Sequence, residues 1–100
     1  MTRDTFEYRD VAVESMDEGG RIVVRPLNGQ AFSPEMRVEC SRQLRDTSVY
    51  PIGTCFLVLA KMTDRQGGEP YLYVFHGDPV KVLTPEQLDT FLNDRRRLRI

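Results

Sequence analysis

Residues 54–62 read TCFLVLAKM, and this stretch forms the centre of the predicted sheet. Alternate side chains of a strand point to opposite faces, and here both faces are mainly apolar. One face carries Phe56, Val58, Ala60 and Met62, and the other carries Cys55, Leu57, Leu59 and Lys61. We therefore expect a central strand that is covered on both sides.

Two shorter strands are expected after this one. The sequence DRQGG at 64–68 is typical of a hairpin turn, and residues 71–76 return as a strand. One face of that strand carries Leu72 and Val74, and the other carries Tyr71, Tyr73 and Phe75. The sequence HGDP at 76–79 predicts a further turn, which leads into a strand over 80–83.

The N-terminal part predicts a hairpin. A strand starting at Phe6 continues past a bulge near Asp10, turns at Gly19-Gly20, and returns over residues 21–27. This register pairs Glu18 with Arg21, Met16 with Val23, and Glu14 with Arg25. Opposite charges then meet twice on one face, while Val13, Ile22 and Val24 share the other. Pro26 cannot donate to a ladder, so the returning strand is an edge or ends there.

Two segments favour helices. Ser33 and Pro34 resemble an N-cap and first turn, and apolar side chains recur at i+4 spacing over residues 34–45, at Met36, Cys40 and Leu44. Val38 faces away from this stripe, and alternation of Met36, Val38 and Cys40 suits a strand instead. A second helix is expected from Thr84, because Gln87 completes a capping box and Leu88, Phe91 and Leu92 form a stripe.

These elements predict an α+β fold in the order ββαβββα. The sheet is antiparallel, has about five strands and two helices, and can curl into a barrel. We expect a single domain over residues 1–100, with loose ends at 1–4 and 96–100. A homodimer is expected as well, because two helices cover only one face of the sheet and a second copy would cover the other.

Composition narrows the possible functions. The chain has 100 residues, 40% of them hydrophobic, and a formal net charge of -1. It contains no apolar stretch of the roughly 18 residues needed to cross a bilayer, so we expect a cytoplasmic protein without a membrane role. Cys40 and Cys55 are then expected to be reduced. With His76 as the single histidine and no glycine-rich phosphate loop, neither a metal nor a cofactor is expected.

The leading functional hypothesis is a non-enzymatic module that binds a small molecule or a protein partner. Its candidate site is an aromatic wall, formed by Phe56, Tyr71, Tyr73 and Phe75. Ring faces attract flat or cationic ligands. The alternative is that these rings simply form the core.

The C-terminal arginines support a second hypothesis, nucleic-acid binding. They are Arg95, Arg96, Arg97 and Arg99. Guanidinium groups neutralise backbone phosphates, but cations also stabilise the C-terminal end of a helix without binding anything. Residues 21–50 are basic too, with five arginines and three acidic residues. An enzyme is the weakest class, because His76 and Asp78 could act as a base and its orienting acid but also suit an ordinary turn.

One stretch carries a resemblance to known proteins. It comprises Leu44-Arg45-Asp46, then Tyr50-Pro51-Ile52-Gly53-Thr54, and then Phe56 with the strand that follows. This pattern resembles small bacterial proteins of unknown function, some of which are carried on mobile integron gene cassettes. The resemblance implies a compact, often oligomeric α+β accessory protein, and it implies no active site.

Overall fold

The computed structural model describes residues 8–64, 68–75 and 80–98. Their strands are β1 (Arg9–Glu18), β2 (Arg21–Pro26), β3 (Val38–Glu39), β4 (Cys55–Thr63), β5 (Tyr71–Val74) and β6 (Lys81–Leu83). A 3-10 helix, η1 (Arg42–Arg45), follows β3, and an α-helix, α1 (Pro85–Leu98), ends the described chain. The fold is therefore mostly β.

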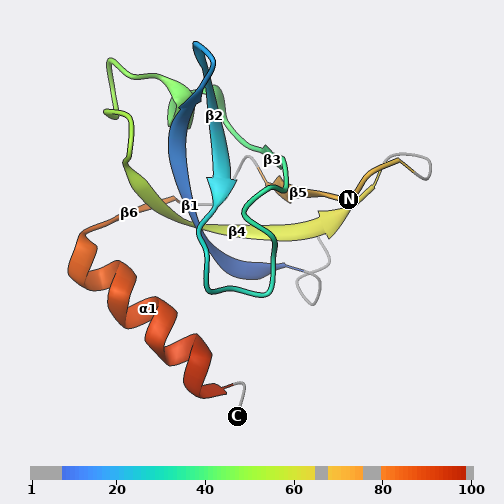
Figure 1. The fold of residues 1–100 in the computed structure, drawn as a ribbon, viewed down its shortest axis with the longest axis vertical. Coiled ribbons are helices and arrows are strands. Elements are labelled where there is room, and N and C mark those ends of the chain that lie inside the picture. The colour runs from blue at the N-terminus through green and yellow to red at the C-terminus, as the bar shows by residue number, and fades with distance from the viewer. Residues whose placement is uncertain (1–7, 65–67, 76–79, 99–100) are drawn as a thin grey trace.

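The strands form one curved sheet that is nearly closed into a barrel. Its order is β2-β1-β4-β5-β3, and β6 pairs with β4 beside the path. The two end strands, β2 and β3, come close together without pairing, and we call the gap between them the seam (Figure 1). The expected barrel-like sheet is thus present in the described chain, with the seam as its opening.

The central position of β4 is confirmed. It pairs with β1 on one side and with β5 and β6 on the other. Phe56, Val58 and Ala60 point into the barrel and are buried, together with Val11 and Val13 of β1. The other face of β4 is only half-buried, so the described part of the chain covers that face incompletely.

The N-terminal hairpin has the expected register. Glu18 pairs with Arg21, and Glu14 pairs with Arg25. Gly19 and Gly20 both adopt positive φ, of 66° and 90°, which a two-residue hairpin turn requires and which side chains resist. β2 ends at Pro26 and lies at an edge of the sheet, where the missing proline N–H faces the seam and costs no ladder bond to β1.

The expected helix over residues 34–45 is wrong. A turn occupies its first residues, β3 pairs in parallel with β5, and only the last residues coil, as η1. Val38, which did not fit the helical stripe, is buried in the core opposite Leu72. The Ser33 hydroxyl accepts from the Glu35 N–H and closes a turn instead of starting a helix. The described chain therefore has one α-helix, and its sheet is mixed, not purely antiparallel.

One side chain completes the ladder where β2 stops. The Gln30 amide lies against the buried backbone of Ala12, whose N–H donates to Gln30 Oε1 at 2.8 Å. Gln30 Nε2 in turn donates to the carbonyls of Ala12, at 2.8 Å, and Leu27, at 3.0 Å. The amide thus takes the place of a further strand residue.

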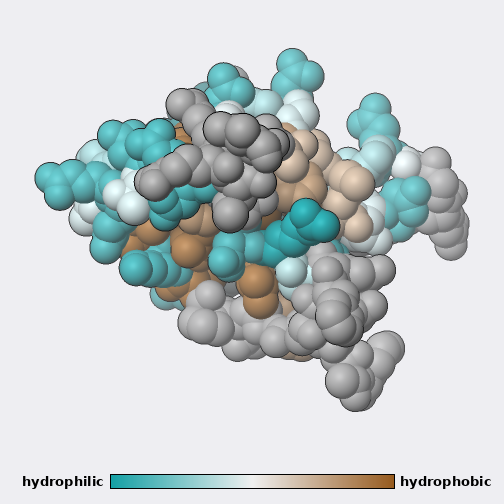
Figure 2. Space-filling model, turned by 90° about the horizontal axis from the view of Figure 1, so that it is seen from below, coloured by the Kyte–Doolittle hydropathy of each residue, from teal (hydrophilic) through white to brown (hydrophobic). Residues whose placement is uncertain are grey.

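Helix α1 extends away from the barrel and packs chiefly against β6 (Figure 1). Its capping box is confirmed, because the Thr84 N–H donates to Gln87 Oε1 and the Gln87 N–H donates to Thr84 Oγ1. Within the described residues, no helix combines the length and apolarity needed to cross a membrane. Hydrophobic atoms reach the surface on the side seen from below, in patches separated by hydrophilic side chains (Figure 2).

Candidate ligand groove

The aromatic residues singled out in the sequence do not share one surface. Phe56 is 0% exposed inside the barrel, where its ring meets Tyr50 edge-on at 5.0 Å. The register pairs Tyr71 with Thr63 and Tyr73 with Lys61, on the opposite face of the sheet. The structure therefore separates Phe56 from the other three rings.

Those three rings lie on the outside of the barrel. The Arg37 guanidinium stacks over Tyr71, with its carbon 4.6 Å from the ring centre. Phe75 is 39% exposed and meets the Tyr8 ring edge-on at 6.5 Å. The Lys61 ammonium lies 5.7 Å from the same Tyr8 ring. These contacts hold Tyr71 and Phe75 against the barrel, and of the three rings only Tyr73 lines the groove described next.

The other candidate residues lie partly or wholly outside the part of the chain that the structure describes. Arg95, Arg96 and Arg97 lie in the last turns of α1, but their side chains fall outside the described part of the chain. Arg99, His76 and Asp78 lie wholly outside the described residues. Their proposed roles stay predictions.

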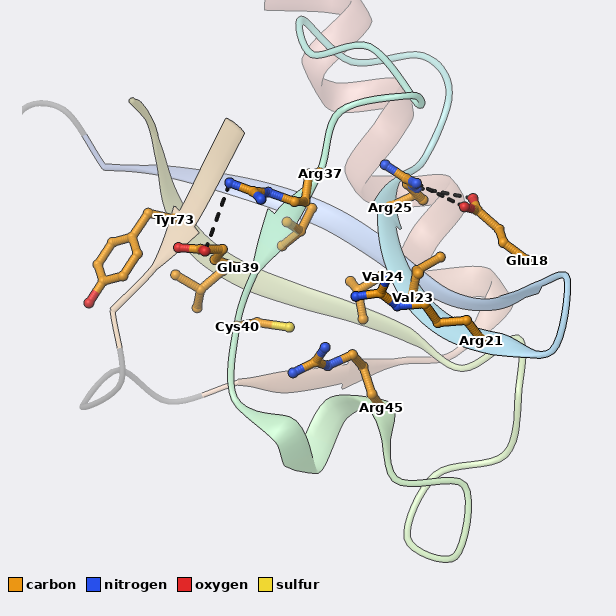
Figure 3. A pocket seen from close by; sticks show the side chains of 12 residues that line it. Glu18, Arg21, Val23, Val24, Arg25, Arg37, Glu39, Cys40, Arg45 and Tyr73 are labelled. Carbon is orange, nitrogen blue, oxygen red and sulfur yellow. Dashed lines mark hydrogen bonds and ion pairs between the residues drawn. The ribbon is translucent and has the colours of Figure 1, made fainter. Parts of the chain in front are cut away.

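The seam carries a groove of about 630 Å³ on the outside of the barrel (Figure 3). β2 forms one wall, and the segment from β3 to η1 forms the other. The buried side chains of Val24, Val38 and Val74 lie beneath it. Four arginines line the walls, namely Arg21, Arg25, Arg37 and Arg45, with two acids, Glu18 and Glu39. We call this the arginine groove.

Arg25 is fixed in place by its neighbours. Its Nε donates to Glu18 Oε2 at 3.0 Å, and its Nη2 donates to Glu18 Oε1 at 2.8 Å. Its Nη1 donates to the Glu35 carbonyl at 2.9 Å, which ties β2 to the chain across the seam. The hydrogen bond from Arg25 lowers the pKa of Glu18 below its ordinary value, so the pair stays charged at neutral pH.

Arg37 is held more loosely on the opposite wall. Its Nη2 lies 3.8 Å from Glu39 Oε1, and its guanidinium stacks on Tyr71. The side chain is nevertheless 60% exposed. Arg25 and Arg37 thus have acidic neighbours, and each contributes little net charge to the groove.

Arg21 and Arg45 differ from these two. Across residues 8–64, 68–75 and 80–94, neither forms an ion pair. They come from opposite walls, and Figure 3 shows both guanidinium groups pointing into the groove beside Cys40. Two uncompensated positive charges therefore converge on one end of the groove. This end is suited to an anion.

A cysteine thiol also lines this groove. Burial raises the pKa of the Cys40 thiol, and the charge of Arg45 offsets that effect only in part. A thiol with a raised pKa is a poor nucleophile at neutral pH. No cluster of three or more His, Cys, Asp or Glu side chains able to hold a metal occurs within the described residues.

Reasoning from the sequence alone did not find this site. In the sequence, residues 21–50 stand out only as a basic segment. The groove is not visible there, because its four arginines are dispersed over 25 positions and come together only across the seam. Comparisons with protein-family models, with curated proteins and with solved structures found no match. The function of this protein must therefore be inferred from the chemistry of the groove itself.

Proposed function

We propose that this protein is a non-enzymatic binding module that takes an anionic ligand in the arginine groove. The observation that supports the proposal is the convergence of Arg21 and Arg45 at one end of that groove, where neither forms an ion pair with a residue that the structure describes. A guanidinium presents parallel N–H donors that match the two oxygens of a carboxylate or phosphate. Two such groups from opposite walls can hold one anion from both sides.

The apolar floor strengthens this site. Val24 and Val38 are buried beneath the groove, so a bound anion would lie against a surface of low polarisability on one side. The fixed position of Arg25 keeps the β2 wall in place, because its three hydrogen bonds reach both Glu18 and the far side of the seam. Less ordering is then needed when a ligand binds.

The proposal can be tested with citrate and pyrophosphate as probes, in calorimetric titrations at low ionic strength. Arg21→Ala and Arg45→Ala should each weaken binding by about tenfold, the effect of losing one charge-assisted contact. Arg42→Ala is the matched control, because Arg42 is an exposed arginine of η1 that does not line the groove. Its affinity should stay within about twofold of the parent protein.

Two results would contradict the proposal. One is an equal loss for Arg42→Ala, which would mean a diffuse charge effect. The other is unchanged affinity of both groove variants. A labelled oligonucleotide serves as a third probe. If its binding survives Arg21→Ala and Arg45→Ala but is lost when the chain is truncated after Asp94, the C-terminal arginines and not the groove bind anions.

A further inference from the structure

The arginine groove does not end at Arg25 and Arg37. The same two side chains also line a second groove, of about 780 Å³, that continues along the seam toward the far end of β4. Met36, Met62 and Pro70 give it apolar lining, and Glu35 and Glu69 also line it. We call this part the methionine end.

The two ends differ in character. At the arginine end, Arg21 and Arg45 form no ion pair with any described residue, whereas at the methionine end Met62 is 57% exposed and Met36 packs against the core. Thioether side chains adapt to apolar groups of different shape. Between the ends, Arg25 and Arg37 already have Glu18 and Glu39 beside them. A ligand that fits both ends is extended, anionic at one end and apolar at the other.

A peptide fits this description better than a lipid or a compact metabolite. Both parts are open along their length, as the exposure of Met62 and of the Arg37 side chain shows, so neither encloses an alkyl chain. Small molecules and alkyl chains prefer sites that bury most of their surface. An extended peptide needs only a few side-chain contacts and main-chain partners along an edge.

The edge of β2 offers such main-chain partners. In this antiparallel pair, Glu18 and Arg21 flank the two-residue turn, and the Leu27 N–H donates to the Ala12 carbonyl at 3.0 Å. Every second residue therefore bonds to β1, and the intervening residues, Ile22 and Val24, direct their N–H and C=O groups toward the seam. Among the strands of the described chain, none pairs with β2 on that side.

We propose that the two grooves together bind an extended acidic segment of a partner protein. An acidic side chain would lie between Arg21 and Arg45, and an apolar side chain would lie against Met36 and Met62. This inference rests on the proposed anion-binding function and adds the class of ligand. It follows from the charge of one end, the apolar lining of the other, and their shared wall.

The test uses fluorescein-labelled synthetic peptides in anisotropy titrations of the full chain. Each peptide carries two aspartates and one leucine, in either order, separated by one to four glycine or serine residues. Matched peptides replace the aspartates by asparagine or the leucine by glycine. The protein variants are Arg45→Ala, Met62→Ser and, as control, Ile52→Ser, which changes a side chain that is 51% exposed and lies outside both grooves.

We expect the best spacer to bind, and Met62→Ser to weaken that peptide by about fivefold through lost apolar contact. The same substitution should leave citrate binding unchanged and should not weaken the peptide that lacks leucine. Arg45→Ala should weaken both citrate and the peptide, and Ile52→Ser should weaken neither. This pattern would support an acidic peptide that occupies both ends.

Other patterns overturn the inference and remain distinguishable. If Arg45→Ala weakens both probes while Met62→Ser and loss of the leucine have no effect, the anion-binding function holds and the peptide proposal is wrong. If Arg45→Ala weakens neither probe, both proposals are wrong. Equal losses from Met62→Ser and Ile52→Ser would also refute the peptide proposal, because the effect would then be unrelated to the groove.

Discussion

Replacing Gln30 by alanine should destabilise the barrel severely for a residue in a loop. Its side chain makes three hydrogen bonds of 2.8 to 3.0 Å to the backbone of Ala12 and Leu27. A hydrogen bond contributes about 0.5–1.5 kcal/mol net, and a buried N–H left without a partner costs about 1–3 kcal/mol. Ala12 is fully buried, so water cannot replace the lost amide there without local opening.

We therefore expect Gln30→Ala to lower the free energy of unfolding by about 2–4 kcal/mol, which for a chain of this size lowers the melting temperature by at least about 8 °C. Urea unfolding followed by circular dichroism measures the free energy, and amide hydrogen exchange should show that Ala12 loses protection. Gln30→Glu should be no more stable than Gln30→Ala at neutral pH, because a carboxylate can accept from the Ala12 N–H but cannot donate to the carbonyls of Ala12 and Leu27.

The refuting result is specific. A loss below about 0.5 kcal/mol for Gln30→Ala, with unchanged exchange at Ala12, would mean that the amide does not complete the ladder. Asn28→Ala is a suitable control, because Asn28 lies in the same loop and, among the described residues, its side chain bonds only to the adjacent Gly29 N–H.

The remaining predictions concern one ion pair and one helix cap. The hydrogen bond from Arg25 lowers the pKa of Glu18 below its ordinary value. The contribution of this ion pair to stability is therefore present above the pKa that Glu18 has in the unfolded chain, and it is lost as pH falls through the pKa that Glu18 has in the folded protein. NMR titration of the Glu18 carboxyl should show a return to the ordinary pKa in Arg25→Gln, and an unchanged pKa there would contradict the contact. Thr84→Ala should cost about 1 kcal/mol of helix stability and reduce the helical circular dichroism signal, since α1 packs chiefly against β6. Equal helicity in Thr84→Ala and the parent protein would show that packing, not the cap, holds the helix.

Local rules predicted the parts of the fold that depend on neighbouring residues. The register of the first hairpin follows from the two-glycine turn and the charge pattern beside it. The cap of α1 follows from Thr84 and Gln87, because both partners lie within four residues. The central strand followed from its apolar character alone.

Predictions failed where distant segments decide the outcome. The stripe of Met36, Cys40 and Leu44 fits a helix. In the structure the segment is a strand instead, because Val38 is then buried beside Leu72, which is 34 positions away in the sequence. The same limit explains why Phe56 was expected on one face with Tyr71 and Tyr73. A one-residue change in register moves all side chains of a strand face to the other side of the sheet, and no local signal fixed the register of β5 against β4. The arginine groove likewise depends on a close approach of β2 and β3 that no short motif encodes.

The edge of β2 that faces the seam also affects the tendency of the protein to aggregate. An unpaired strand edge invites a second copy to add its own strand, which is the first step of edge-to-edge aggregation. If two β2 edges paired antiparallel about Val23, Arg21 of each copy would face Arg25 of the other, and Pro26 would remove one donor from each edge. Because Glu18 already neutralises Arg25, it is chiefly the missing proline donor that opposes self-association through this edge of the sheet.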